Sequence, residues 1–288
     1  MQLALVGSER LEAFPGGRGQ CPTCSAVMVA KCGPRILHHW AHAGRRDCDP
    51  WWENETEWHR EWKNLFPEDC REISHTAPDG EIHRADIMTP TGIYIEVQHS
   101  AMSDAERISR EAFYKNLVWV IDGRGFRDNF DIYHRLPDPR SEIARDIVWS
   151  KATRPMQGAA GGLFFRLAEM QRDYPERTIT KATLSFGRIY SLRDIQADVE
   201  DSYCGHHQYD WVRPRRTWLD ATCPVFIDFG GEFLLKLEIY DESNLPCVRY
   251  VPKTTFLYEV MVETDARAIT SHVFRRTTAD AGRYERGG

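Results

Sequence analysis

Apolar and polar residues alternate along the segment His83–Ser100, and this alternation predicts a β-hairpin. Over residues 93–98, Ile and Val alternate with Tyr, Glu and Gln, so apolar side chains share one face of a strand and polar ones the other. The turn at residues 89–92 has Pro where a type I turn needs a φ of about −65°, and Gly where a left-handed residue must follow. Counting outward from this turn, Asp86 falls opposite Glu96.

Further elements are predicted on both sides of the hairpin. A capping box that begins at Asn54 opens a helix to about residue 66, and one that begins at Ser103 opens a second helix to about residue 116. A strand is predicted around residues 71–75. The continuous apolar run at 117–121 predicts a buried central strand. The predicted order is therefore helix, strand, hairpin, helix, buried strand.

The first predicted helix carries two stripes of side chains. Its apolar stripe consists of Trp58, Trp62 and Leu65, and its polar stripe consists of Glu55, His59 and Lys63. Residues four apart lie on the same side of a helix, so the three polar side chains are expected to point the same way. A solvated helix face with an internal ion pair would give the same pattern, and this alternative stays open.

The carboxylates of Asp86 and Glu96 face each other in the predicted hairpin. Like charges directly opposite each other destabilise a sheet, and a divalent cation held between them would remove the repulsion. Carboxylate oxygens are the ligands that hard divalent cations prefer. Gln98 shares the face of Glu96. The alternative is a polar hairpin face that is open to water.

A second candidate metal site lies in the first fifty residues. Cys and His occur there at spacings that suit tetrahedral Zn²⁺, and the candidates are Cys21, Cys24, His39, His42 and Cys48. We expect four ligands, Cys21 and Cys24 plus two of the other three, in a small module that the metal stabilises. A reduced CxxC turn with unrelated histidines is the alternative. A thioredoxin-like redox motif is disfavoured because no βαβ pattern surrounds the two cysteines.

The composition limits the class of protein. The 288 residues are 42% hydrophobic and 28% charged, with eight cysteines and a formal net charge of −6. We expect a soluble, cytoplasmic globular chain, because the N-terminal residues do not read as a signal peptide and no apolar run reaches the length of a membrane span. In a reducing compartment the cysteines are expected to be metal ligands or buried thiols. The net charge argues against binding nucleic acid by bulk positive charge.

The hairpin motif resembles the active site of the PD-(D/E)XK nuclease superfamily, in the variant where Gln replaces the usual Lys: Asp86 is followed by Glu96-x-Gln98. The wider segment, roughly residues 20–125, resembles the CoiA-like competence proteins. The motifs that carry this second resemblance are Arg-Ala-Asp at 84–86, Ile-Glu-x-Gln at 95–98, Glu-x3-His-x3-Lys at 55–63, CPxC at 21–24 and HxAH at 39–42.

These resemblances imply a metal-dependent nuclease that hydrolyses single- or double-stranded DNA in uptake, recombination or defence. Asp86 and Glu96 would hold Mg²⁺ or Mn²⁺, with Glu55 as a candidate third ligand. Lys63 or His59 could supply what the missing Lys provides. The zinc module would be structural or would help to hold the substrate.

Substrate contacts are expected from the second predicted helix. Arg107 and Arg110 could clamp phosphates, and Tyr114 could stack on a base or sugar. Ordinary surface packing is the alternative for Arg107. Gln98 can orient water by hydrogen bonds, but it provides neither a cation nor a useful proton acceptor, so the general base is undefined by the sequence.

The predicted fold is α/β, with a PD-(D/E)XK nuclease-like core at residues 51–150. A zinc-binding module at 1–50 precedes it, and a strand-rich α+β region at 151–275 and a disordered tail at 276–288 follow. Cys204, His206, His207 and Cys223 could form another metal site in the C-terminal half, but nothing fixes their spacing.

Two other functions stay open at this point. One is a catalytically silent DNA-binding module of a larger complex, and the other is a zinc-organised protein-interaction adaptor. Protein partners in DNA processing are a further expectation, and a membrane partner is not.

Overall fold

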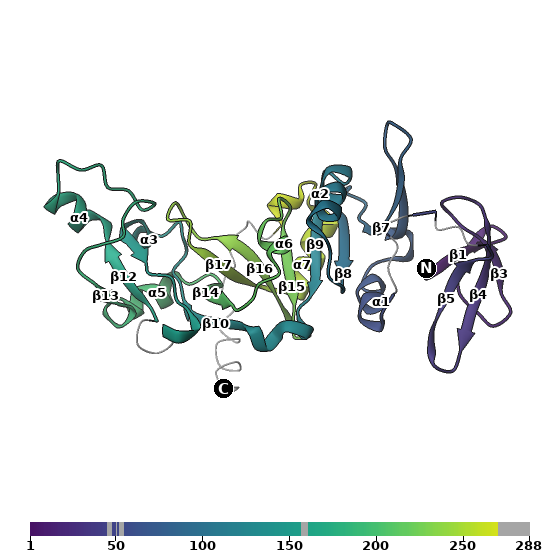
Figure 1. Cartoon of the computed structure of the whole chain (residues 1–288), viewed down its shortest axis with the longest axis horizontal. Coiled ribbons are helices and arrows are strands. Elements are labelled where there is room, and N and C mark those ends of the chain that lie inside the picture. The colour runs from purple at the N-terminus through teal and green to yellow at the C-terminus, as the bar shows by residue number, and fades with distance from the viewer. Residues whose placement is uncertain (45–47, 50, 52–54, 157–160, 270–288) are drawn as a thin grey trace. The chain divides into compact units, whose positions relative to one another are not determined.

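The computed structural model describes residues 1–44, 48–49, 51, 55–156 and 161–269, and it shows a mixed α/β protein (Figure 1). The chain forms two compact units. Unit 1 comprises residues 1–122, 220–225 and 257–269, and the described part of unit 2 comprises residues 123–219 and 226–256. The domain boundary predicted near residue 150 lies within unit 2. Within the described ranges, the helices are too short or too polar to cross a bilayer.

Unit 1 begins with an antiparallel five-stranded sheet in the order β2-β1-β3-β4-β5. Its strands are β1 Leu3–Val6, β2 Glu9–Glu12, β3 Arg18–Gln20, β4 Val27–Gly33 and β5 Ile36–His42. Buried Met28 and Trp40 form its small core with Cys21. In β5, histidines interrupt the apolar alternation that would mark a strand in the sequence.

The second part of unit 1 contains four strands in the order β9-β8-β7-β6. Its elements are α1 Glu57–Asn64, the 3₁₀ helix η1 Glu68–Cys70, β6 Arg71–Thr76, β7 Ile82–Met88, β8 Tyr94–Gln98, α2 Asp104–Phe113 and β9 Leu117–Asp122. Strands β6, β7 and β8 are antiparallel, whereas β8 and β9 are parallel and are joined through α2. This is the predicted order of elements, and β9 is buried along its whole length as predicted.

The hairpin has the predicted register. Ile87 pairs with Ile95, so the next position outward places Asp86 opposite Glu96. Gly92 has the required left-handed conformation, with φ of 84°. The prediction that β8 has one apolar and one polar face is confirmed, but both faces are buried: Glu96 is 4% exposed and Gln98 is 3% exposed. A polar hairpin face open to water is therefore wrong.

Helix α1 is shorter than predicted. Its N-cap is Thr56, whose hydroxyl accepts a hydrogen bond from the His59 N–H. Asn54, the predicted cap, lies outside the described residues. Trp58 and Trp62 are buried as predicted, but Leu65, the C-cap of the helix, is 51% exposed. Helix α2 begins at the predicted cap, where Ser103 accepts from the Glu106 N–H.

Unit 2 is rich in strands, as predicted for the C-terminal region. One group has the order β10-β14-β17-β16-β15 and another the order β11-β12-β13. The strands are β10 Phe130–Arg135, β11 Ile147–Trp149, β12 Leu163–Arg166, β13 Tyr190–Ser191, β14 His206–Trp211, β15 Val225–Asp228, β16 Phe233–Ile239 and β17 Pro246–Pro252. The helices of the remaining chain are η2 Arg124–Asn129, α3 Glu142–Asp146, η3 Arg154–Met156, α4 Leu167–Asp173, η4 Leu192–Asp194, α5 Gln196–Ser202, α6 Arg216–Leu219, α7 Lys253–Val262 and η5 Ala266–Ala268.

Strands β15, β16 and β17 are consecutive in the chain and pair as antiparallel neighbours. Helix α3 ends at Asp146, and residues 147–149 form β11, where β-branched Ile and Val pair with β12. The tail at 276–288 lies outside the described residues.

Candidate functional site

Polar side chains from α1, β7, β8 and α2 meet at one cavity within unit 1. The cavity has a volume of about 50 Å³, enough for one or two waters or a small cation. Seven of the nine residues predicted for catalysis or substrate binding line it: Glu55, His59, Lys63, Asp86, Glu96, Gln98 and Arg110. Polar groups from segments that are far apart in the sequence therefore line the same cavity.

Asp86 and Glu96 each have a partner side chain from a neighbouring helix. Asp86 Oδ1 lies 2.8 Å from His59 Nε2, and Asp86 Oδ2 accepts a hydrogen bond of 3.0 Å from the Val97 N–H. Glu96 Oε2 accepts from Arg110 at 2.8 Å. The other oxygen, Glu96 Oε1, is buried and has no hydrogen-bond partner among the described residues. A buried carboxylate oxygen without a partner is costly, so this atom would be stabilised by a cation bound in the cavity.

The two carboxyl groups have opposite pKa shifts. Burial raises the pKa of Glu96 to about 8, and the nearby Asp86 carboxylate adds to this shift, against the opposing charge of Arg110. Burial acts in the same direction on Asp86, but His59 and Lys63 outweigh it and lower the pKa of Asp86 to about 2. At neutral pH this pair therefore consists of one ionised carboxylate, Asp86, and one carboxyl group that readily binds a proton, Glu96.

Helix α1 contributes a buried cation held by two further carboxylates. Lys63 Nζ pairs with Glu55 and, at 2.9 Å, with Glu72. Burial acts to lower the pKa of Lys63, but Glu72 and Glu55 outweigh it and raise the pKa. Lys63 is therefore a fixed positive charge and not a proton acceptor. Glu55 precedes the helix, yet its carboxylate still reaches Lys63, as the predicted stripe required.

Glu72 was missed by sequence reasoning. It lies in β6 with φ of 50°, a left-handed conformation that is unfavourable for a residue with a side chain. Its carboxylate is 3% exposed and accepts from the backbone N–H groups of Gln2 and Leu3 at 2.8 and 2.9 Å. Strained residues of this kind cluster at functional sites. The sequence offered no signal for it, because β6 is mostly polar and Ile73 is its one apolar residue.

Asp49 and Trp51 form another wall of the cavity that the sequence did not indicate. Asp49 accepts hydrogen bonds of 2.9 Å from His83 Nδ1 and from the Arg84 N–H. The Trp51 ring stacks on His83 with 3.3 Å between ring centroids, and its carbonyl accepts from Arg110. No local pattern marks these residues, because the groups of His83, Arg84 and Arg110 that they contact are more than thirty positions away.

Two predicted substrate-binding residues do not line the cavity. Arg107 is 4% exposed and pairs with Glu111 at 2.7 Å, which leaves it unavailable to clamp a phosphate. Tyr114 is 0% exposed and packs against the rings of Trp51, Tyr94 and Phe113, so its ring has no open face for a base or sugar. Both predictions assumed that this side of α2 faces solvent, whereas it faces the protein.

The N-terminal sheet brings four of the five predicted zinc ligands together. The ligand atoms of Cys21, Cys24, His42 and Cys48 all lie within 4.8 Å of one another. Cys21 Sγ is 3.7 Å from Cys48 Sγ, and Cys24 Sγ is 3.3 Å from His42 Nε2. Tetrahedral Zn²⁺ with Zn–S bonds of about 2.3 Å and Zn–N bonds of about 2.0 Å places neighbouring ligand atoms about 3.5–3.8 Å apart. The four residues therefore fit a closed zinc site.

The thiols of this cluster interact electrostatically. Burial acts to raise the pKa of Cys21, but the backbone N–H groups of Cys24 and Thr23 outweigh it and lower the pKa. Burial and the neighbouring Cys21 raise the pKa of Cys48 to about 12. A zinc ion at this cluster would displace the thiol protons and stabilise the thiolate forms of the cysteines.

His39, the fifth candidate, is outside this cluster. Successive side chains of a strand point to opposite faces, so His39 and His42 of β5 project from different sides of the sheet. His39 Nδ1 instead lies 2.8 Å from the Leu37 carbonyl oxygen. Among the three residues that the sequence left as alternatives, the structure favours His42 and Cys48.

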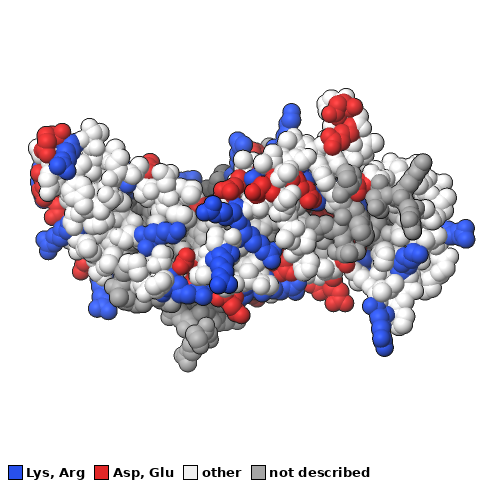
Figure 2. Space-filling view, viewed as in Figure 1, with Lys and Arg blue, Asp and Glu red and all other residues white. Residues whose placement is uncertain are grey.

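Charged side chains are mixed on the surface. On the face shown in Figure 2, Lys and Arg are interspersed with Asp and Glu. This agrees with the net charge of −6 and favours local contacts over bulk attraction for any polyanion. No protein-family model matches the chain, and neither a curated protein nor a solved structure matches it, so its function is inferred from the geometry of the site.

Proposed function

We propose that unit 1 is a metal-dependent nuclease of the PD-(D/E)XK type, similar to the CoiA-like proteins, that hydrolyses phosphodiester bonds of DNA. One observation carries the proposal: Asp86 and Glu96 from adjacent strands line one cavity, and Glu96 Oε1 is buried there without a hydrogen-bond partner among the described residues. A divalent cation would satisfy that oxygen. The order of α1, β6, β7, β8, α2 and β9 supports the same proposal.

Asp86 and Glu96 would hold Mg²⁺ or Mn²⁺, with Glu55 as the third candidate ligand. Such an ion stabilises charge on phosphoryl oxygens and lowers the pKa of a bound water. Gln98, at the end of β8 on the Glu96 side, would orient water through its amide. Lys63 would supply positive charge, because Glu55 and Glu72 keep it protonated.

Two side chains of the protein hold the carboxylates of this site in place and also compete with a metal ion for them. His59 and Arg110 occupy one oxygen each of Asp86 and Glu96, which keeps two carboxylates close together despite their repulsion. A divalent ion must compete with these contacts. We therefore expect this cavity to bind a divalent ion weakly in the absence of substrate. The zinc site is expected to be structural, because its four protein ligands leave no open position for substrate.

The proposal is tested by cleavage of labelled single- and double-stranded DNA during titration with Mg²⁺ or Mn²⁺. Wild type should cleave, and Asp86→Asn and Glu96→Gln should each lose roughly a hundredfold or more of the rate, because each removes a ligand of the catalytic ion. Glu61→Gln is the matched control, since Glu61 is an exposed carboxylate on the outer face of α1. Full activity of the Asp86→Asn, Glu96→Gln double variant would refute the proposal.

The ion pairs favour a second candidate function, a catalytically silent module that binds DNA. Both carboxylates already have nitrogen partners in the protein, His59 and Arg110, as expected where no metal is needed. The same titration separates the two candidates. DNA binding with no cleavage under any metal condition, unchanged in Asp86→Asn, would support the silent module.

A further inference from the structure

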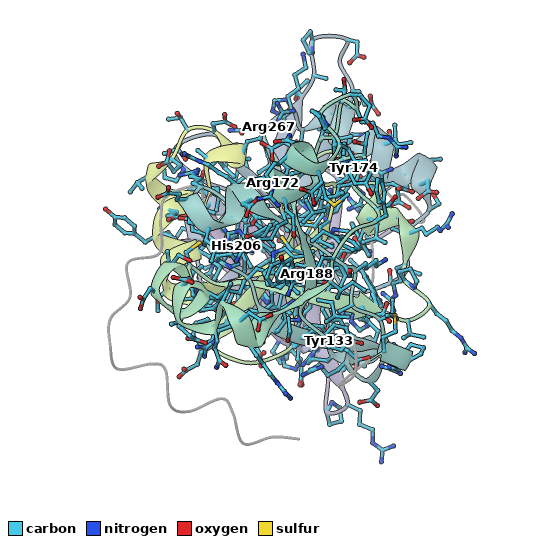
Figure 3. The ribbon with its side chains drawn as sticks, turned by 90° about the vertical axis from the view of Figure 1, so that its left-hand side faces the viewer. Tyr133, Arg172, Tyr174, Arg188, His206 and Arg267 are labelled. Carbon is cyan, nitrogen blue, oxygen red and sulfur yellow. The ribbon has the colours of Figure 1, made fainter. Side chains whose placement is uncertain are left out.

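Unit 2 contains three polar side chains in series that the proposed nuclease does not use. Cys204 Sγ lies 3.2 Å from His206 Nδ1, and His206 Nε2 lies 3.2 Å from Glu238 Oε2. His206 begins β14 and is labelled in Figure 3, and Glu238 lies on β16. All three line a cavity of about 210 Å³ within unit 2.

We propose that Cys204, His206 and Glu238 form a second catalytic site, in which the Cys204 sulfur attacks the acyl carbon of a small anionic ester or thioester. The arrangement is that of a nucleophile, a general base and a residue that orients the base. Cys204 is the nucleophile and His206 the base, and Glu238 is a positioning residue.

The local backbone brings the thiol to the imidazole. Gly205, between the two residues, has φ of 105°, and a Cβ at this position would lie 3.0 Å from the Tyr250 carbonyl oxygen. The Tyr250 N–H donates a hydrogen bond of 3.0 Å to the Gly205 carbonyl oxygen. Only glycine fits this left-handed turn against β17, and the turn sets Cys204 beside His206 at the end of a strand.

Glu238 is held ionised. It accepts hydrogen bonds from Arg249 and pairs with Lys236, each at 2.9 Å. Burial acts to raise the pKa of Glu238, but the hydrogen bond from His206 and the charges of Lys236 and Arg249 outweigh it and lower the pKa to about 2. A carboxylate at Nε2 favours the tautomer with hydrogen on that nitrogen. This leaves Nδ1 as the acceptor that faces Cys204.

The thiol depends on this base. Burial, with smaller effects of nearby carboxylates, raises the pKa of Cys204 to about 12, so the group is protonated at rest. As the sulfur bonds to the acyl carbon, its proton passes to His206 Nδ1 and then to the departing alcohol or thiol. Water, deprotonated by His206, hydrolyses the acyl-Cys204 thioester to a carboxylic acid and the free thiol.

The charge of the cavity selects an anionic substrate. Three cations and two carboxylates line it, which leaves a surplus of one positive charge: Arg140, Lys236 and Arg249 against Asp138 and Glu238. The same surplus disfavours a divalent metal. Cys247 Sγ lies within 4.8 Å of ligand atoms of His206 and Glu238, but a metal ion there would add two positive charges beside Lys236 and Arg249.

The proposal is tested on the full chain by alkylation with iodoacetate and iodoacetamide, with each cysteine followed by mass spectrometry. The sulfur displaces iodide and His206 takes the thiol proton. The ratio of the iodoacetate rate to the iodoacetamide rate should be higher for Cys204 than for the thiol of glutathione. His206→Gln should slow the alkylation of Cys204 at least about tenfold, because a general base accelerates a reaction by that factor or more. Cys223 is the internal control, since burial also raises the pKa of this thiol, to about 11.

Two further measurements keep the proposal falsifiable if His206→Gln does not fold. In wild type, the alkylation rate of Cys204 should rise as an imidazole loses its proton and then level off, whereas an unassisted thiol would gain rate throughout the alkaline range. Glu238→Gln should move that inflection to lower pH, which a merely structural role would not do. p-Nitrophenyl acetate should release nitrophenolate in a burst and leave an acetyl group on Cys204.

Three outcomes would overturn the proposal. In the first, Cys204 reacts no faster than Cys223. In the second, the pH profile of Cys204 lacks the plateau. In the third, unit 2 carries zinc that Glu238→Gln releases, and removing it exposes the thiol, which would assign the residues to a metal site instead.

Discussion

Asp86 and Glu96 come from the two paired strands of the β7–β8 hairpin and line one cavity, yet each has its partner on a different helix, His59 of α1 and Arg110 of α2. The hairpin alone would be destabilised by this pair of carboxylates. The two helices supply the compensating charges, so the repulsion at the centre of unit 1 is balanced by groups distant in the sequence.

The opposite pKa shifts of the pair predict how metal binding depends on pH. Asp86, with a pKa of about 2, stays ionised, whereas Glu96 must lose its proton, with a pKa of about 8, before it can bind a cation. Mn²⁺ affinity measured by calorimetry should rise up to about tenfold per pH unit from pH 6 to pH 8 and then level off. Glu96→Gln should abolish this slope. A flat profile in wild type would show that Glu96 is not a ligand.

Glu96 also makes the stability of unit 1 depend on pH. Its pKa is higher in the folded protein than the value of about 4.3 for an unfolded chain. The folded state therefore binds more protons than the unfolded state. The contribution of protonated Glu96 to the free energy of unfolding is complete below about pH 4.3, and it is lost as the pH rises through about 8. Urea denaturation should show a loss on the order of 1 kcal/mol per pH unit from this group near neutrality. The slope should be smaller in Glu96→Gln, and an equal slope in both proteins would contradict the assignment.

Lys63 is expected to be essential for folding. Replacing it with Met leaves Glu55 and Glu72 buried without their main cation, and breaking a buried ion pair costs about 3–5 kcal/mol. Lys115→Met is the matched control, because Lys115 is exposed and its replacement should change the free energy of unfolding by less than about 0.5 kcal/mol. Denaturation monitored by tryptophan fluorescence compares the two, and similar midpoints would refute the network.

The zinc cluster makes a prediction with a built-in control. His42→Gln should lose the bound zinc and lower the melting temperature of unit 1, because it removes one of four ligands. His39→Gln, a change of the same type on the opposite face of β5, should retain about one zinc per chain. Metal analysis of the purified variants distinguishes them. Equal zinc loss in both would show that the ligand set is wrong.

The hairpin could be predicted from the sequence because its determinants are local. Alternation defines the strands, and Gly92 with its preceding turn defines the register, so the position of Asp86 followed by counting. The caps of the helices are equally local, and Ser103 was identified correctly. These features depend on residues within a few positions of one another.

The partners of the site could not be predicted because they depend on tertiary packing. Helical periodicity places Arg107 and Tyr114 on defined sides of α2, but it does not say which side the sheet covers, and both proved to be buried. The contacts of Glu72 and Asp49 span tens of residues in the sequence. For Leu65 the prediction was wrong in the opposite sense. The periodic pattern placed it in the buried apolar stripe, but the helix ends at Asn64 and Leu65 is exposed.

The peptide bond between Cys48 and Asp49 joins the sulfur cluster to the hydrogen bonds that fix His83 and Arg84 on β7. Consecutive Cα atoms are only about 3.8 Å apart, so neither group can shift far without displacing the other. A fragment that began after Cys48 would keep the hairpin but would lose the anchor of one cavity wall. Anyone transplanting this hairpin into another scaffold would therefore have to carry the first five strands with it.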